Sequence, residues 1–355
     1  MIFRIYLYIK RIIYYASKWI GLFKLARHLT RRGLRIVCYH GFSLIDEDLY
    51  NPQTFLKTET FYKRLQFLSE NGFQVIELDR ALNLLEHGNL PPSSIVITID
   101  DGFYSTYECA YPLLKKFSFP ATIYITTYYA IKESPIFRLV IPYMFWKTKK
   151  KSFDITGLGL QRSGLIPMDK SHETNSVIKD IIRYGETQCN NEERSNIAKM
   201  VGERLDVDYQ SIVKSRILSV MNVNEIRELS ENGIDIQLHT HRHSLPLDKI
   251  LTSREISENR SAIEPLVEKP LSHFCYPSGQ WSKKHWPWLA EVGIISAVTC
   301  DLGLNYPNTP RLALKRFCDH GDLSQIEFEA EVNGYAEIMR AIFPRINRIA
   351  NRFRQ

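Results

Sequence analysis

The sequence lacks several features that mark particular classes of protein. Nowhere in its 355 residues is there an uninterrupted run of about 18 apolar residues, so a membrane-spanning helix is not expected. A C-x-x-C pair is also missing, which argues against a cysteine-ligated zinc site. The six cysteines are scattered, mostly among apolar residues, and this pattern predicts free thiols in a reducing compartment. Because no clean apolar segment with a small-residue cleavage site is present, the sequence predicts a cytoplasmic protein.

Acidic residues are absent from both ends of the chain. Residues 1–35 contain no Asp or Glu, and Arg340 to Arg354 contains five Arg and no acid, although the net charge is only +7. Basic ends on a balanced body favour contact with an anionic surface such as a membrane, and they argue against a nucleic-acid-binding core. Two solvated, charged helices would give the same pattern.

The N-terminal segment, residues 1–33, is both apolar and basic. Trp19 and several Tyr are interrupted by Arg4, Lys10, Arg11 and Lys18. This composition is typical of an amphipathic helix that lies in a membrane interface. We therefore expect a peripheral location at the inner membrane, with an ordinary helix packed on the body as the alternative.

The body of the chain alternates strand-like and helix-like segments. With 44% hydrophobic and 24% charged residues it can form a sizeable core. Residues 95–99 form a continuous β-branched run, typical of a strand buried on both faces of a parallel sheet. A helix near 107–117 and a strand at 121–125 follow, which makes a βαβ unit. We expect an α/β fold, a distorted (β/α) barrel over residues 34–325. A helical insertion at about 130–215 and a basic C-terminal helix at 326–355 complete it.

Two adjacent carboxylates, Asp100 and Asp101, end the apolar strand and are followed by Gly102. Their mutual repulsion is offset if a cation binds there, and one carboxylate can then bind a metal while the other acts as a base. A plain turn is the alternative, since Asp and Gly favour turns.

Three histidines in five residues, His239, His241 and His243, follow the strand-like segment at 234–238. Neutral imidazole is a common zinc ligand, so this cluster predicts a metal site, with a polar loop as the alternative. The residue after His239 is Thr240, where a helical zinc peptidase motif would have its catalytic Glu. The sequence therefore argues against a peptidase.

Together these motifs resemble the polysaccharide deacetylase family, also called the NodB-homology domain. Residues 97–102, ITIDDG, look like the family's T-F-D-D-G motif, and His239-Thr240-x-x-His243 looks like its H-[ST]-x-x-H motif. The insertion accounts for the roughly 140 residues between them. The resemblance implies that Asp100 is the catalytic base and that Asp101, His239 and His243 bind the metal. His241 is the alternative ligand.

The third motif of the family, typically R-x-P-Y-G-like, is altered in this chain. The corresponding segment is FCYPSG at 274–279, in which Cys275 stands where the motif has Arg. A subgroup with F-x-Y-P-x-G is closer, and there a later Arg, for which Arg316 is the candidate, would orient the base. The late Leu-x-x-His motif that supplies the general acid is not recognisable. His40 is the expected substitute, and His320 is second.

The resemblance implies metal-dependent hydrolysis that removes N-acetyl, or alternatively O-acetyl, groups from a polysaccharide or a lipid-linked saccharide. A divalent metal ion is the expected cofactor, and zinc suits two imidazoles and one carboxylate best, although the same ligands tolerate other divalent ions. The expected partners are a carbohydrate and an anionic membrane, and no nucleic acid. Because Cys275 replaces the motif Arg, a non-catalytic carbohydrate-binding protein with the same fold is the competing interpretation.

Overall fold

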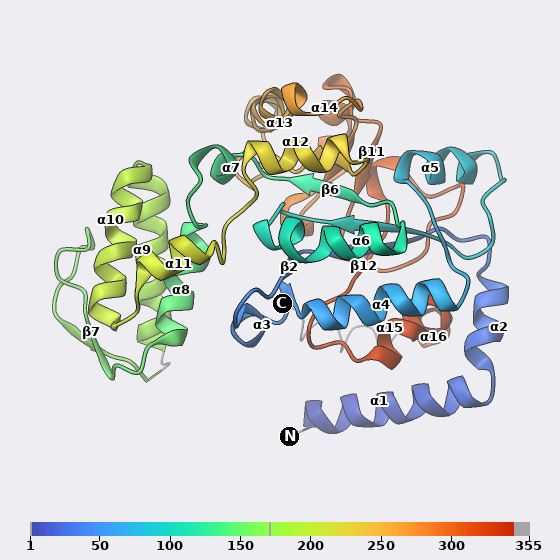
Figure 1. Ribbon diagram of the computed structural model, residues 1–355, viewed down its shortest axis with the longest axis horizontal. Helices are drawn as coiled ribbons and strands as arrows, with labels where there is room; N and C mark the ends of the chain where they lie inside the picture. Colours follow the sequence, from blue (N-terminus) through green and yellow to red (C-terminus); the bar gives the residue numbers. More distant parts are fainter. Residues whose placement is uncertain (1, 170–171, 344–355) are drawn as a thin grey trace.

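The computed structural model describes residues 2–169 and 172–343, and its centre is a parallel β-sheet (Figure 1). The sheet has eight strands in the order β11-β10-β9-β6-β5-β1-β12, with β4 also paired to β5. Their bounds are β1 (Arg35–Tyr39), β4 (Gln74–Val75), β5 (Ser94–Ile99), β6 (Thr122–Ile125), β9 (Asp235–Leu238), β10 (His273–Cys275), β11 (Ser296–Val298) and β12 (Phe317–Cys318). Because the strand pairs of this sheet run parallel, their carboxyl ends meet at one edge.

The sheet curls into a barrel whose seam is only partly closed. β12 pairs with β1 at one end of the strand order. The residues just before β12 reach the other end, where Leu314 forms a parallel bridge to Val298 of β11. The predicted α/β fold with a distorted barrel is therefore confirmed, and the segment from Leu314 to Cys318 is what joins the two ends.

Alternate side chains of the strands fill the concave side of the sheet. Ile36 and Val96 belong to one buried cluster with Tyr124, Cys275 and Leu314, which come from strands far apart in the sequence. The helix α5 (Leu78–Glu86) contributes its buried leucines to the same cluster. A second cluster lies between the sheet and the helices around it. Those helices are α4 (Thr58–Glu70), α6 (Tyr111–Phe117), α12 (Val223–Glu231), α13 (Lys249–Ile263) and α14 (His285–Glu291).

Residues 128–215 form a mostly helical lobe beside the carboxyl edge of the sheet, on the left in Figure 1. It contains α7 (Tyr128–Lys132), α8 (Phe137–Lys147), β7 (Ser152–Asp154), β8 (Leu165–Pro167), α9 (His172–Gln188), α10 (Asn191–Leu205) and α11 (Tyr209–Ser215). Tyr143 of α8 donates a 2.6 Å hydrogen bond to Asp46, next to the short helix α3 (Glu47–Tyr50). The lobe is thereby held against the loop that follows β1, which also carries β2 (Gly41–Phe42) and β3 (Phe55–Leu56).

The N-terminal helices α1 (Ile2–Trp19) and α2 (Leu22–Leu29) pack on α15 (Gln325–Val332) and α16 (Tyr335–Ile342). Three basic side chains of α1 pair with acids of α15: Lys10 and Arg11 contact Glu327 at 2.9 and 3.0 Å, and Lys18 contacts Glu329. Burial would raise the pKa of Glu327, but the neighbouring Lys10 lowers it to about 2. Within residues 2–169 and 172–343, no helix has both the length and the hydrophobicity needed to cross a bilayer.

The expected basic C-terminal helix is only partly described. Residues 326–343 belong to α15 and α16, and α15 itself is acidic. Arg340 is paired with Glu331 and Glu337. The other arginines of the predicted basic stretch lie outside the described residues.

Candidate active site

A hollow of about 250 Å³ lies at the carboxyl edge of the sheet and gathers polar side chains from several strand ends. His40 follows β1, Asp100 and Asp101 follow β5, and His239 follows β9. In parallel α/β barrels this edge is where functional groups collect. The lobe supplies part of the wall through residues 136–139.

Three of the predicted site residues, Asp101, His239 and His243, converge although the two motifs are far apart in sequence. The Nε2 atoms of His239 and His243 lie 3.2 and 3.3 Å from the same oxygen, Oδ1 of Asp101. All three residues offer ligand atoms within 4.8 Å of one another. Sharp local turns aim these side chains, because Asp101 and His243 adopt φ values of 68° and 55°, which non-glycine residues rarely adopt.

The hydrogen bonding of His239 indicates that a cation belongs between these groups. Its Nδ1 lies 2.8 Å from the backbone oxygen of Cys275, which can only accept, so Nδ1 carries the proton. In the neutral ring Nε2 is then an unprotonated acceptor, and it faces the acceptor Oδ1 of Asp101. Two acceptors at this distance repel unless a metal or a proton lies between them. The fixed tautomer is the arrangement that metal-binding histidines commonly show, so the residues present fit a divalent metal.

The charges of this cluster are strongly coupled. Burial would raise the pKa of Asp101, but His243 and His239 hold it well below its usual range. Burial lowers the pKa of His243 to about 4, which keeps that imidazole neutral at physiological pH. Burial also opposes the charged form of His239, but Asp101 outweighs it and raises the pKa of His239. A neutral His243 beside an ionised Asp101 is the protonation state that metal binding requires.

Asp100 lies beside this cluster and is held by Arg316. The guanidinium makes two parallel 2.8 Å hydrogen bonds, from NH1 to Oδ1 and from NH2 to Oδ2, and both side chains are buried. Burial alone would raise the pKa of Asp100, but Arg316 lowers it well below its usual range. This fork-to-fork geometry fixes the carboxylate and keeps it ionised. Arg316 therefore reaches Asp100 from the position just before β12, and its Nη2 also lies 3.3 Å from Sγ of Cys275, which stands where the family motif has its Arg.

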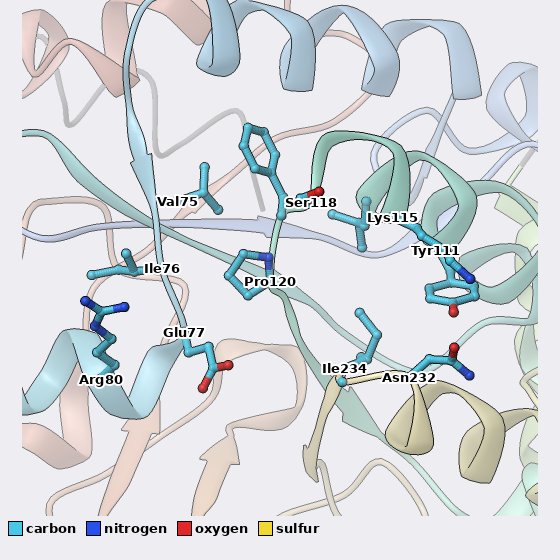
Figure 2. A pocket seen from close by; sticks show the side chains of 13 residues that line it. Val75, Ile76, Glu77, Arg80, Tyr111, Lys115, Ser118, Pro120, Asn232 and Ile234 are labelled. Atoms are coloured by element: carbon cyan, nitrogen blue, oxygen red, sulfur yellow. The ribbon is translucent and has the colours of Figure 1, made fainter.

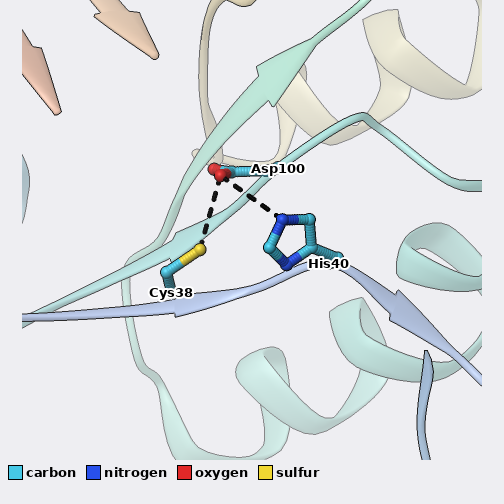
Figure 3. Close-up of side chains that lie close together, drawn as sticks. All are labelled: Cys38, His40 and Asp100. Atoms are coloured by element: carbon cyan, nitrogen blue, oxygen red, sulfur yellow. Dashed lines mark hydrogen bonds and ion pairs between the residues drawn. The ribbon is translucent and has the colours of Figure 1, made fainter. Parts of the chain in front are cut away.

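Two thiols also contact Asp100, and the sequence did not predict them. Cys275 and Cys38 place their Sγ atoms 3.3 and 3.4 Å from Oδ2. Figure 3 shows Cys38, on β1, and His40, just after that strand, approaching the same carboxylate. The signal was available in the alternation of the strand, because Cys38 is two residues before His40 and so shares its face. A positively charged Arg316 beside this group disfavours a second cation at Asp100, which leaves Asp101, His239 and His243 as the better ligand set.

His40 lines the hollow together with His239 and His243, and its Nε2 lies 3.8 Å from Oδ2 of Asp100. The next residue, Gly41, is tightly packed, since a Cβ there would lie 2.4 Å from the ring of Phe55. His241 also lines the hollow, but its Nδ1 contacts Thr127 Oγ1 at 2.8 Å, outside the metal-ligand group. His320 is not among the residues that line the hollow.

A second hollow, of about 720 Å³, lies at the amino ends of the strands (Figure 2). Arg80 and Lys115 stand on opposite sides of it, with Pro120 between them. Among the described residues, no group of three potential metal ligands includes any of its lining side chains. The groups of potential metal ligands that the described residues form lie at the other edge of the sheet.

The family model described as polysaccharide deacetylase matches residues 197–296 of the chain. This span contains His239, His243 and the segment 274–279, all of which lie at or beside the hollow. Over this span the chain is similar to the polysaccharide deacetylase family. The matched span ends before Arg316 and begins after Asp100, so the model does not cover those two residues.

Curated relatives match part of the chain. A putative polysaccharide deacetylase, YxkH of Bacillus subtilis, is 32% identical over 110 residues, which is 31% of this chain and 35% of the relative. The poly-beta-1,6-N-acetyl-D-glucosamine N-deacetylase of Escherichia coli is 34% identical over 90 residues, 23% of this chain and 13% of the relative. The alignments therefore span about a third or less of these relatives' own length.

Solved structures share the fold over a larger part of the chain. The Streptococcus pyogenes deacetylase PplD, in complex with acetate, superposes with a TM-score of 0.55 at 15% identity, covering 84% of this chain and 98% of PplD. IcaB from Ammonifex degensii gives a TM-score of 0.51 at 15% identity, covering 85% and 97%. At this identity the likeness shows the fold, and the activity is argued from the site.

Proposed function

We propose that this protein is a member of the polysaccharide deacetylase family and a metal-dependent deacetylase that hydrolyses an acetamide, or alternatively an acetyl ester, on a saccharide. The observation that carries the proposal is the convergence of Asp101, His239 and His243 on one oxygen, beside a buried Asp100 held by Arg316. The relatives whose names include N-deacetylase support deacetylation as the reaction. The ligand atoms of Asp101, His239 and His243 support its dependence on a metal.

Asp101, His239 and His243 would hold the metal, and zinc is the preferred ion for two imidazoles and one carboxylate. When bound, the metal supplies a Lewis acid for the acetyl carbonyl and lowers the pKa of a bound water. The hydrogen bond from His239 Nδ1 to Cys275 orients that ligand before any metal arrives.

Asp100 is the proposed general base. Arg316 keeps its carboxylate ionised and fixes its direction, so that Oδ2 can take the proton of the attacking water. His40 is the proposed general acid, because it lies next to Oδ2 and lines the same hollow. It would donate its proton to the leaving nitrogen. Arg316 does not line the hollow and is a positioning residue.

Acetate release from a panel of acetylated oligosaccharides, with zinc and then with a chelator, tests this function. We expect release that the chelator abolishes and added zinc restores. A non-catalytic carbohydrate-binding protein is the second candidate, favoured by Cys275 at the motif position of Arg. It would bind the glycans without releasing acetate, whether or not metal is present.

We further propose a cytoplasmic location at the inner face of a membrane, with a lipid-linked saccharide as substrate. The acid-free N-terminal segment and its exposed apolar side chains support this location. Fractionation of cells that produce the full chain should place it in the membrane pellet. Acetate release should be faster from an acetylated saccharide carried on a lipid than from the same saccharide alone, and equal rates would contradict the lipid-linked substrate.

A further inference from the structure

The outer face of α1 is apolar and exposed. Residues spaced three to four apart on this helix and just after it form one stripe, as a helix of 3.6 residues per turn requires. Six of them are between 47% and 88% exposed: Tyr8, Ile9, Ile12, Ile13, Trp19 and Ile20. On α2, Leu25 and Leu29 are 52% and 64% exposed. Several large apolar side chains exposed along one face of α1 mark an interaction site.

The polar side of α1 is the side that packs on the body. Lys10, Arg11 and Lys18 form their ion pairs with α15, and Ser17 is hydrogen-bonded to Tyr335 of α16 at 2.8 Å. An ordinary surface helix has the opposite arrangement, with its apolar stripe on the core. In this protein the ion pairs hold the helix so that its apolar stripe points away from the body.

We propose that the outer face of α1 and α2 inserts into the interface of a lipid bilayer and fixes the protein there by apolar burial. The inference deepens the proposed membrane location and does not depend on deacetylation. Trp and Tyr side chains favour the headgroup region, and isoleucines beside them favour the acyl boundary.

Charge favours a bilayer over a second copy of the chain. Lys24 and Arg32 are exposed on α2 and at its end, and residues 1–35 contain no acid. A symmetric dimer through this face would place these cations near their own copies without counter-charges. Anionic lipid headgroups at the edge of the inserted face would neutralise them.

The mode of attachment has a measurable consequence. Lys10, Arg11 and Lys18 of α1 are already paired with Glu327 and Glu329, so these three cations contribute little to an electrostatic attraction. Binding should therefore persist when salt is raised from about 0.1 M to about 1 M, which shortens the Debye length from ~10 Å to ~3 Å. Attachment by charge alone would show the reverse, namely binding that salt weakens.

Co-sedimentation of the full chain with vesicles tests the inference. We use neutral phosphatidylcholine vesicles and vesicles that also contain phosphatidylglycerol, at low and high salt. The wild-type chain should bind both kinds, with a preference for the anionic vesicles because of Lys24 and Arg32, and high salt should reduce that preference without releasing the protein. Ile12→Gln and Trp19→Gln should each lower partitioning at least about tenfold, since each removes a large inserted apolar side chain. Ile250→Gln is the matched control, because Ile250 is 78% exposed on α13 and should not matter.

Three results would overturn the inference. Binding to anionic vesicles alone, reversed by salt, would mean electrostatic attachment. An absence of vesicle binding would remove the bilayer as the occupant. A dimer in light scattering that Ile12→Gln dissociates would assign the face to a second copy. Vesicle binding without acetate release from any glycan would support this inference and contradict the proposed activity.

Discussion

Two hollows lie at opposite edges of the sheet, and the larger of them is not the one that contains the candidate catalytic residues. The amino-end hollow is larger, about 720 Å³ against 250 Å³, yet its charged residues Glu77, Arg80 and Lys115 are exposed. The carboxyl-end hollow has buried Asp100 and His239 at its floor. Burying ionisable groups is unfavourable unless partners compensate them. Compensated buried charge therefore identifies the functional end better than volume does.

The largest effect should come from His239→Ala. Removing one imidazole leaves Asp101 and His243 as an incomplete ligand set, so tight metal binding and acetate release should both be lost. His241→Ala is the matched control, because His241 contacts Thr127 instead of the cluster. Elemental analysis that finds about one metal per chain in the His239 variant would show that the ligand assignment is wrong.

Asp100→Asn should keep the metal but lower acetate release by about 10²-fold or more, the usual effect of removing a general base. The amide is nearly the same shape as the carboxylate, so metal content serves as the check that the site still forms. Unchanged turnover with bound metal would take Asp100 out of the mechanism.

Arg316→Lys should have a smaller effect, and one that depends on pH. Lysine retains the charge but cannot form both hydrogen bonds to Asp100, so the pKa of Asp100 should rise from its lowered value. The base is then protonated at a higher pH, and the acidic limb of the rate profile should move upward. Lys315→Gln, an exposed neighbour, should leave the profile in place. An unshifted profile in the Arg316 variant would contradict its positioning role.

Lys115→Ala at the amino-end hollow should have the smallest effect. The side chain is exposed and contacts the ring of Tyr111, so stability should change by no more than about 0.5 kcal/mol. Metal content and acetate release should match the wild type. A marked loss of activity would contradict the assignment of function to the carboxyl end alone and would indicate that the larger hollow also contributes to function.

Much of the site follows from local sequence pattern. The β-branched run before Asp100 predicts a buried strand, and parallel strands bring their carboxyl ends together, so the meeting of Asp101 with His239 and His243 could be expected. Arg316 could be proposed as a candidate only by analogy. Its approach depends on the bridge between Leu314 and Val298, a long-range closure that no local pattern encodes.

The contacts of the N-terminal segment show where prediction from sequence ends. From its sequence alone, an acid-free, basic helix is predicted to have its cations facing a membrane. Their actual partners, Glu327 and Glu329, are more than 300 residues away in the chain. Composition shows cations in the N-terminal segment and acids at positions 327 and 329, but only the tertiary fold pairs them and so determines which side of α1 is exposed.

The bridge at the barrel seam also has a consequence for synthesis on the ribosome. β5, with Asp100 at its end, is translated early, whereas Arg316 and β12 emerge more than 200 residues later. Until then the carboxylate has no guanidinium to compensate its burial, so the nascent barrel should remain open and hydrated at that point. Final closure would be a late step, after release of the segment around Leu314. Nascent chains arrested before residue 314 should therefore be more sensitive to protease at β1 and β5 than chains arrested after residue 343.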